Sequence, residues 1–172
     1  GRHVRLGRLV IIVCTGCPKN TQHVVQPILE RESGLTAGAV NLQPSTFNLE
    51  HRFLLAFSYE RVMPGKLLAY ITDFPRVVGG IDEESTRRAV TLYETIVNRQ
   101  VSGTDALTAE MSKVIENAYR DVNIAFANEM ALACERMGVD AFEIRDLINA
   151  RPDRHLHTPG AGVGGHCLPK DS

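Results

Sequence analysis

The end of the sequence holds the residues best suited to covalent chemistry. Cys167 follows a glycine-rich segment, residues 159–165, and is itself followed by Lys170 and Asp171. Glycines let the backbone approach a ligand closely, and a nearby positive charge lowers the pKa of a thiol towards its nucleophilic form. The pattern predicts a ligand-binding loop that ends in a nucleophilic cysteine. The alternative is a flexible tail with an incidental cysteine.

A second pair of polar residues lies in the middle of the chain. Lys113 and Asn117 stand four residues apart within residues 105–137, a segment without proline or glycine. Such a segment predicts one long helix, on which side chains at i and i+4 share a face. An amine and an amide on one face can stabilise a developing alkoxide. Taken alone, the two residues fit an ordinary solvated polar face better.

The same segment predicts a partner. At 1.5 Å per residue, a helix over residues 105–137 would be about 50 Å long. A helix of that length cannot bury its apolar stripe against a small neighbouring domain alone. We expect it to pack against a second copy of this chain, forming a homodimer. The alternative is that it packs on domains outside this sequence.

The elements that must position these residues can be read from local patterns. β-branched and apolar runs predict strands, and apolar positions at helical spacing predict helices. Strands are expected at residues 9–13, 53–57 and 76–80, and helices at 21–31, 82–97, 105–137 and 139–150, whereas 67–71 is ambiguous. This order implies an α/β layer architecture. We expect one domain over residues 1–100 and an all-helical one over 101–172.

Composition excludes several classes of protein. The chain has 172 residues, 44% of them hydrophobic and 23% charged, with a formal net charge of −1. These values predict neither general nucleic-acid binding nor a membrane-spanning segment. The start of the sequence does not resemble a secretory signal, so we expect a cytoplasmic protein with reduced cysteines. No GxGxxG motif follows an expected strand, and neither a P-loop nor an HExxH motif is present.

Cys14 and Cys17 allow a rival interpretation as half of a metal or redox site. A lone CxxC is weak, because tetrahedral zinc needs two more ligands. His155, His157 and Cys167 could supply them only if the chain folds back. We therefore expect no metal. A further alternative is a dimerisation core without catalytic activity.

Four separated blocks resemble the UDP-glucose/GDP-mannose dehydrogenase family. They cover residues 10–21, 58–66, 108–129 and 164–171, in the order in which the family has them. The third block and the terminal Gly-Gly-His-Cys-Leu-Pro-Lys-Asp are the specific ones. The run Glu-Asn-x-Tyr-Arg-Asp-Val-Asn, with a histidine before the cysteine, is similar to enzymes acting on UDP-N-acetylmannosamine; UDP-glucose is the alternative substrate.

The sequence also departs from the family. Cys17, Lys19 and Asn20 replace the usual residues of a Ser-Thr-Val-Pro-Pro-Gly-Thr turn, Tyr59 replaces a proline, and residues 39–50 look like an insertion. The family's glycine-rich dinucleotide unit and its last, uridine-binding domain have no counterpart in this sequence. The resemblance therefore implies the remnant of a Rossmann-like NAD domain followed by a helical central (dimerisation) domain. We expect this piece alone to be inactive.

The resemblance also implies site residues. Cys167 would add to an aldehyde, Lys113 and Asn117 would hold the alkoxide, and Asp171 would orient the hydrolytic water. Further residues are assigned to the cofactor NAD or to the UDP-sugar substrate. NAD would contact Thr15, Glu60 and Lys170, of which Thr15 and Glu60 would also act in catalysis. The UDP-sugar would contact Gly160, Gly162, Gly164, Arg154 and His157.

Overall fold

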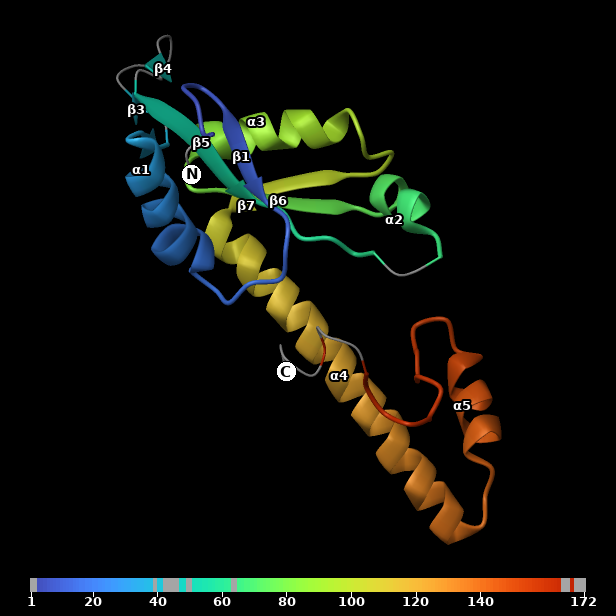
Figure 1. The fold of residues 1–172 in the computed structure, drawn as a ribbon. Helices are drawn as coiled ribbons and strands as arrows, with labels where there is room; N and C mark the ends of the chain where they lie inside the picture. Colours follow the sequence, from blue (N-terminus) through green and yellow to red (C-terminus); the bar gives the residue numbers. More distant parts are fainter. Residues whose placement is uncertain are drawn as a thin grey trace. The chain divides into compact units, whose positions relative to one another are not determined.

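The computed structural model describes residues 3–38, 40–41, 47–48, 51–62, 65–164 and 168 (Figure 1). The chain divides into two compact units, Gly1–Lys113 and Val114–Ser172. The long helix α4 (Ala106–Met137) contributes residues to both.

The first unit is built on one mixed sheet. Its strands are β1 (Leu9–Ile12), β2 (Thr36–Ala37), β5 (Arg52–Phe57), β6 (Arg76–Gly80) and β7 (Val101–Asp105). The path is β1-β5-β6-β7, with β2 also pairing with β5. β1 and β5 are parallel, β5 and β6 antiparallel, and β6 and β7 parallel. Two short strands, β3 (Val40–Asn41) and β4 (Phe47–Asn48), form a separate antiparallel pair.

Helices complete both units. The first unit contains the π-helical turn η1 (Thr21–Val25), α1 (Gln26–Ser33), α2 (Leu67–Asp73) and α3 (Glu83–Glu94), and the second contains α5 (Ala141–Asn149). Helix α3 lies over one face of the sheet (Figure 1).

Strand β5 explains why the sheet is buried on both faces. Its residues Phe53 to Phe57 are all less than 2% exposed. Ala56 packs with Tyr93 of α3, whereas Phe53 and Leu55 pack with Leu29 of α1 on the other side. A continuous apolar run is what a strand covered on both faces requires.

Most of the expected elements are confirmed. The ambiguous segment 67–71 is helical, as part of α2. Gly34 and Gly138, both with φ near 72°, follow α1 and α4, and Asp82 caps α3 by accepting the Ser85 N–H at 2.7 Å. A glycine after a helix and an aspartate before one are common signals of its ends. The α/β fold class is therefore confirmed.

The sequence pattern did not indicate β7, nor the two-residue strands β2, β3 and β4. The residues of β7 include Ser102, Gly103 and Asp105, which are poor strand formers. Pairing with β6 supplies the backbone hydrogen bonds that local propensity does not. Its last residue, Asp105, also accepts the Thr108 N–H at 2.9 Å and the Thr108 hydroxyl, which lower the pKa of the Asp105 carboxyl.

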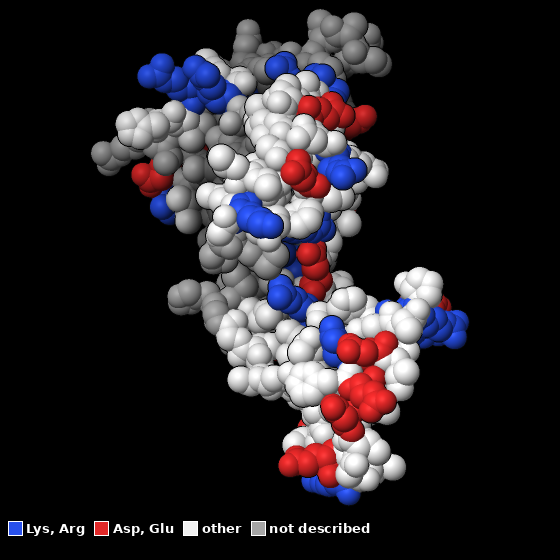
Figure 2. Space-filling view, turned by 90° about the vertical axis from the view of Figure 1, so that its right-hand side faces the viewer, with Lys and Arg blue, Asp and Glu red and all other residues white. Residues whose placement is uncertain are grey.

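The surface carries no strong field on the face that Figure 2 shows. Acidic and basic side chains are interspersed there, in agreement with the small net charge. In the part of the chain that the structure describes, none of the helices combines the length and apolar character needed to cross a bilayer.

Helix α4 begins in close contact with β6, and glycine makes this possible. A Cβ on Gly79 would lie 2.3 Å from the Asp105 carbonyl oxygen and 2.7 Å from the Ala109 Cβ. Real Cβ atoms do not approach that closely, so any side chain here would push the first turn of α4 away from the sheet.

We expect Gly79→Ala to lower the free energy of unfolding by more than about 2 kcal/mol, because overpacking against backbone cannot be relieved by a rotamer change. Urea denaturation followed by circular dichroism measures this. Gly103→Ala is the matched control, since its Cβ would meet only the Thr86 and Val90 methyl groups at 3.1 Å. Equal stability of the two variants would contradict the close approach.

Candidate active site

Two of the expected site residues follow neighbouring strands. Thr15 comes after β1 and Glu60 after β5, and the last residues of these parallel strands, Ile12 and Phe57, are direct partners. The two carboxyl ends therefore lie at the same edge of the sheet, where open α/β sheets bind ligands. Thr15 is half-buried, and the Glu60 side chain is 28% exposed.

Glu60 is held by a buried arginine. Arg76 is 4% exposed and donates to both Glu60 carboxylate oxygens, at 2.6 and 2.7 Å. Phe57 pairs with Gly79 in the antiparallel ladder, and continuing that register places Glu60 opposite Arg76. The pair is thus a cross-strand contact with bidentate geometry, which fixes orientation as well as charge.

Two further donors of Arg76 are also used. Its Nε donates to the Ser58 hydroxyl at 2.9 Å and one terminal nitrogen donates to the Tyr93 hydroxyl at 3.0 Å. The guanidinium carbon lies 4.1 Å from the centre of the Tyr93 ring. Since both Glu60 oxygens accept from one cation, the orientation of the carboxylate is fixed, as positioning a water molecule requires.

The turn that carries Thr15 is tied to α4 by a buried carboxylate. Glu110, which is 1% exposed, accepts the backbone N–H groups of Lys19 at 2.6 Å and Thr21 at 2.8 Å. Sequence reasoning did not single out Glu110. The sequence feature that could have indicated Glu110 is its position. It lies three residues before Lys113, in the first turns of α4, where Ala106 and Ala109 are buried.

Arg76 was also missed. The signal was a lone arginine at the start of a β-branched run, in a strand expected to be buried. A charge in such a place needs a partner of opposite sign, and Glu60 follows the neighbouring expected strand. The antiparallel register that joins the two is not visible in the local pattern.

Lys113 and Asn117 both lie on α4, as expected. The Lys113 ammonium is 5.3 Å from the centre of the Tyr59 ring, and its side chain is half-buried. Asn117 belongs to the second unit and is 7% exposed. A buried Asn117 beside a half-buried Lys113 fits a functional face better than a solvated one.

Within the second unit, the loop after α5 carries the expected substrate residues. The Gly160 N–H donates to Asn128 Oδ1 at 2.8 Å, and Gly162 has a φ of 93°, which favours glycine. Gly164 has open space where a Cβ would lie. Arg154 forms an exposed ion pair with Asp153 at 2.8 Å.

His157 sits in an electropositive part of the same unit. Burial, then His155, then Arg120 lower the pKa of the His157 imidazole. The two histidine rings are 5.1 Å apart, edge to face. A lowered pKa keeps His157 neutral near pH 7, so it would meet a phosphate as a hydrogen-bond donor, with Arg120 as the nearby permanent cation.

Several expected residues cannot be placed. Cys167, Lys170 and Asp171 lie outside the described residues. Cys14 and Cys17 are both exposed free thiols. Within the described ranges, three or more potential ligands do not gather anywhere in a way that could hold a metal ion.

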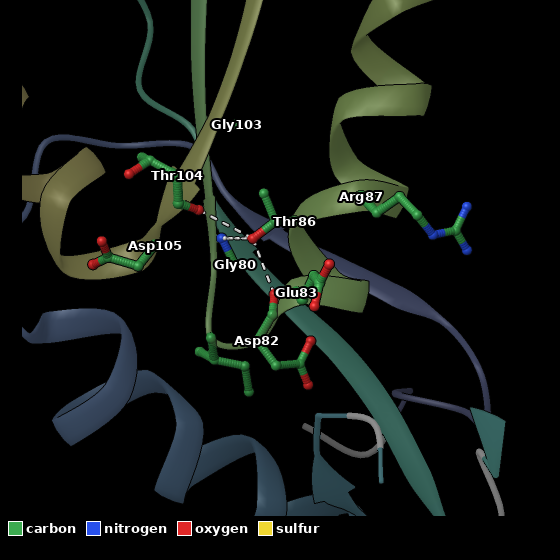
Figure 3. A pocket seen from close by; sticks show the side chains of 9 residues that line it. Gly80, Asp82, Glu83, Thr86, Arg87, Gly103, Thr104 and Asp105 are labelled. Atoms are coloured by element: carbon green, nitrogen blue, oxygen red, sulfur yellow. Dashed lines mark hydrogen bonds between the residues drawn. The ribbon is translucent and has the colours of Figure 1, made fainter. Parts of the chain in front are cut away.

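A hollow of about 430 Å³ opens elsewhere, where β6 and β7 end against the first turn of α3 (Figure 3). The Thr86 hydroxyl lies at its centre. It accepts a hydrogen bond from the Gly80 N–H and donates one to the Asp82 carbonyl, each at 3.0 Å. Gly80 ends β6, whereas Arg76 starts it. The hollow therefore lies away from the carboxyl edge, and its aspartates, Asp82 and Asp105, serve as helix caps.

Comparison with known proteins identifies a class of dehydrogenases. Residues 107–172 match the central domain of the UDP-glucose/GDP-mannose dehydrogenase family. A UDP-N-acetyl-D-mannosamine dehydrogenase of Pyrococcus horikoshii is 42% identical over 165 residues, which are 96% of this chain and 36% of that protein. One from Methanocaldococcus jannaschii is 40% identical over 153 residues, 86% of this chain and 36% of that protein.

Solved structures agree. The structure of the UDP-D-ManNAc dehydrogenase of Pyrococcus horikoshii matches 98% of this chain and 37% of its own, with a TM-score of 0.85 and 42% identity. An NDP-N-acetyl-D-galactosaminuronic acid dehydrogenase of Methanosarcina mazei Go1 matches 99% of this chain and 34% of its own, with a TM-score of 0.82 and 41% identity.

The chain belongs to the UDP-glucose/GDP-mannose dehydrogenase family, and the expected membership is confirmed. It spans 36% of the length of the Pyrococcus horikoshii relative. The sheet and its flanking helices form the Rossmann-like part, and α4 with α5 forms the helical central part, as the resemblance implied.

The turn at Lys19 yields a stability prediction. Lys19 has a φ of 72°, in the left-handed region that favours glycine. We expect Lys19→Gly to raise the free energy of unfolding by about 0.5–1 kcal/mol. The left-handed conformation costs an L residue about 1–2 kcal/mol, and the flexibility of glycine offsets part of that gain.

Urea denaturation compares this variant with Lys66→Gly, a control at a position whose φ is −133°. The control should not gain stability. A Lys19→Gly variant that is no more stable than Lys66→Gly would show that the turn is not strained.

Proposed function

We propose that the complete protein oxidises the C6 primary alcohol of a UDP-sugar to a carboxylate with NAD, the substrate being UDP-N-acetylmannosamine. Relatives that carry the name UDP-N-acetyl-D-mannosamine dehydrogenase, at 42% and 40% identity, support this substrate. The observation that carries the proposal is the carboxyl edge of β1 and β5. Thr15 and Glu60 follow these two strands. The segments that carry them also contact α4, through the Lys19 N–H on Glu110 and the Tyr59 ring on Lys113.

The residues at this edge fit the reactive end of NAD. Thr15 and Glu60 lie where an α/β sheet takes a ligand, and Glu60 keeps a fixed, partly exposed carboxylate. Lys170 would add a contact to the cofactor phosphates. When bound, NAD accepts a hydride in each of two oxidations.

The reaction balances with one water. The primary alcohol, two NAD⁺ and one water give a carboxylate, two NADH and three protons. In the first oxidation the hydroxyl loses its proton and C6 loses a hydride, which leaves an aldehyde. Lys113 and Asn117 stabilise the alkoxide that develops on the oxygen, as fixed donors in a water-poor site do.

The second oxidation needs a covalent intermediate. The Cys167 thiolate forms a bond to the aldehyde carbon, giving a thiohemiacetal, and loss of a second hydride converts this into a thioester. Water, oriented by Asp171 and by the fixed carboxylate of Glu60, then attacks the thioester. The carbon–sulfur bond breaks, which releases the carboxylate and returns the thiol.

The loop of the second unit would bind the sugar nucleotide. Gly160, Gly162 and Gly164 let its backbone approach the ligand. The Gly160 N–H is already donated to Asn128, so Gly160 would contribute shape rather than a hydrogen bond. Arg154 and His157 would meet the phosphates.

The thiols support a cytoplasmic location. Cys14 and Cys17 are free and exposed, and Cys134 is free and half-buried. Free, exposed cysteines persist in a reducing compartment. A cytoplasmic site would also spare Cys167 from oxidation.

The test of this function measures NADH formation and uronic acid release from UDP-N-acetylmannosamine and, separately, from UDP-glucose. We expect Cys167→Ser to lower carboxylate formation by at least about 10³-fold, the scale on which loss of a nucleophile acts. Cys134→Ser is the matched control and should keep the wild-type rate. Carboxylate formed at the normal rate by Cys167→Ser would refute the nucleophile. A wild-type protein that oxidises neither sugar would favour an inert core.

We also propose that the protein is a homodimer through α4. The described part of this helix exposes an apolar stripe at helical spacing: Ile115, Tyr119, Val122, Phe126 and Met130, between 38% and 69% exposed. An exposed apolar stripe of this length is expected to be covered in the native assembly. A second copy offers the same stripe, so the contact can be symmetric.

We expect Val122→Glu to convert the dimer into a monomer, because a carboxylate buried between two copies of the stripe would be unpaired. Sedimentation velocity gives the mass. Glu135→Lys, at an exposed position on the opposite side of α4, is the control and should stay dimeric. A wild-type protein that is monomeric would contradict the dimer and leave the stripe to domains outside this sequence.

A further inference from the structure

Tyr59 lies close to two cations. It is 3% exposed, and its ring centre is 5.3 Å from the Lys113 ammonium nitrogen and 5.0 Å from the Arg61 guanidinium carbon. A cation within about 6 Å of an aromatic ring is attracted by the negative face of its π system. Tyr59 therefore contacts the Lys113 amine, which stabilises the developing alkoxide in the proposed reaction.

Hydrogen bonds fix the hydroxyl end of the ring, and apolar packing holds the ring itself. Arg61 donates to its hydroxyl at 2.8 Å and is itself anchored on the Pro75 carbonyl at 2.6 Å. The Ser112 hydroxyl lies 3.3 Å from the same oxygen. The ring packs with Phe57 and with Ala109 of α4. A ring held in this way presents a rigid surface to Lys113.

The direction of Tyr59 follows from its neighbours in the sequence. Ser58 and Glu60 both bind Arg76, so they point to one side of the extended chain. Side chains in an extended segment alternate, and Tyr59 therefore points to the other side, towards α4. The carboxylate of Glu60 and the amine of Lys113 are thus fixed by adjacent residues of one short segment.

We propose that Tyr59 is a positioning residue, whose ring holds the Lys113 ammonium where the alkoxide forms; the role in the reaction rests on the proposed function. A lysine side chain has a flexible four-carbon stem, and ordering it costs rotamer entropy. The ring reduces that cost before the substrate binds. The proline of the motif that this segment resembles has neither an aromatic face nor a hydroxyl, so it could not hold the ammonium in this way.

The contact can be tested without any activity. The lysines are Lys19, Lys66, Lys113 and Lys170, so ¹³C labelling at Cε gives few NMR signals, and Lys113→Arg assigns the relevant one. Its Hε protons should show a ring-current shift in the wild type and in Tyr59→Phe. The shift should vanish in Tyr59→Leu and persist in Tyr70→Leu, a control that removes a ring stacked on Phe74 in α2. A Lys113 signal that is the same in the wild type and in Tyr59→Leu overturns the proposal.

The role in the reaction is tested in the complete protein with NAD and UDP-N-acetylmannosamine. Tyr59→Leu should lower kcat about tenfold, the range that one cation–π contact supports, and change the KM values by less than about twofold. Tyr59→Phe should recover most of kcat, and Tyr70→Leu should not change it. Equal kcat values for the wild type and Tyr59→Leu overturn the positioning role.

The two readouts separate two kinds of failure. A wild-type protein that oxidises no UDP-sugar refutes the proposed function and, with it, the role of Tyr59 in that reaction. The ring-current shift still supports the contact if Tyr59→Leu abolishes it. A normal oxidation rate combined with an unshifted Lys113 refutes the contact and leaves the proposed function standing.

Discussion

A guanidinium buried inside a sheet has to be neutralised and fully hydrogen-bonded, and Arg76 imposes this requirement on the segment opposite it. Removing such a charge from water is costly unless a carboxylate and further acceptors surround it. Ser58, Glu60 and Tyr93 supply these groups. The chain beyond β5 must therefore stay extended for three more residues, which determines where Glu60 and its neighbour Tyr59 point.

The same kind of constraint acts on the other side of the candidate site. Glu110 is as buried as the apolar core, and its two oxygens are satisfied by backbone N–H groups from the turn after β1. Because a buried carboxylate without donors would be costly, the turn and the helix must form together. Two buried ionisable side chains, one basic and one acidic, thus organise three segments that are far apart in the sequence.

Patterns of short range predicted much of this fold. The apolar run of β5, the glycines after α1 and α4, and the aspartate before α3 act locally, so they can be recognised without tertiary information. β7 could not be recognised in this way, because its serine, glycine and aspartate form a strand only through pairing with β6. Motif resemblance pointed to Glu60 and Lys113. Their partners Arg76 and Tyr59 depend on strand register and helix packing, which a single sequence does not encode in its local pattern.

The lysine in the turn after β1 makes that turn dependent on its surroundings. A glycine would adopt a positive φ by itself, whereas Lys19 adopts it against its own preference, held by the Glu110 carboxylate on its N–H. Opening of the first turns of α4 would remove that carboxylate, and the lysine would then relax towards an ordinary backbone conformation. The loop bearing Thr15 and the start of the long helix should therefore open and close as one cooperative unit. Local unfolding would then remove both segments from the carboxyl edge together.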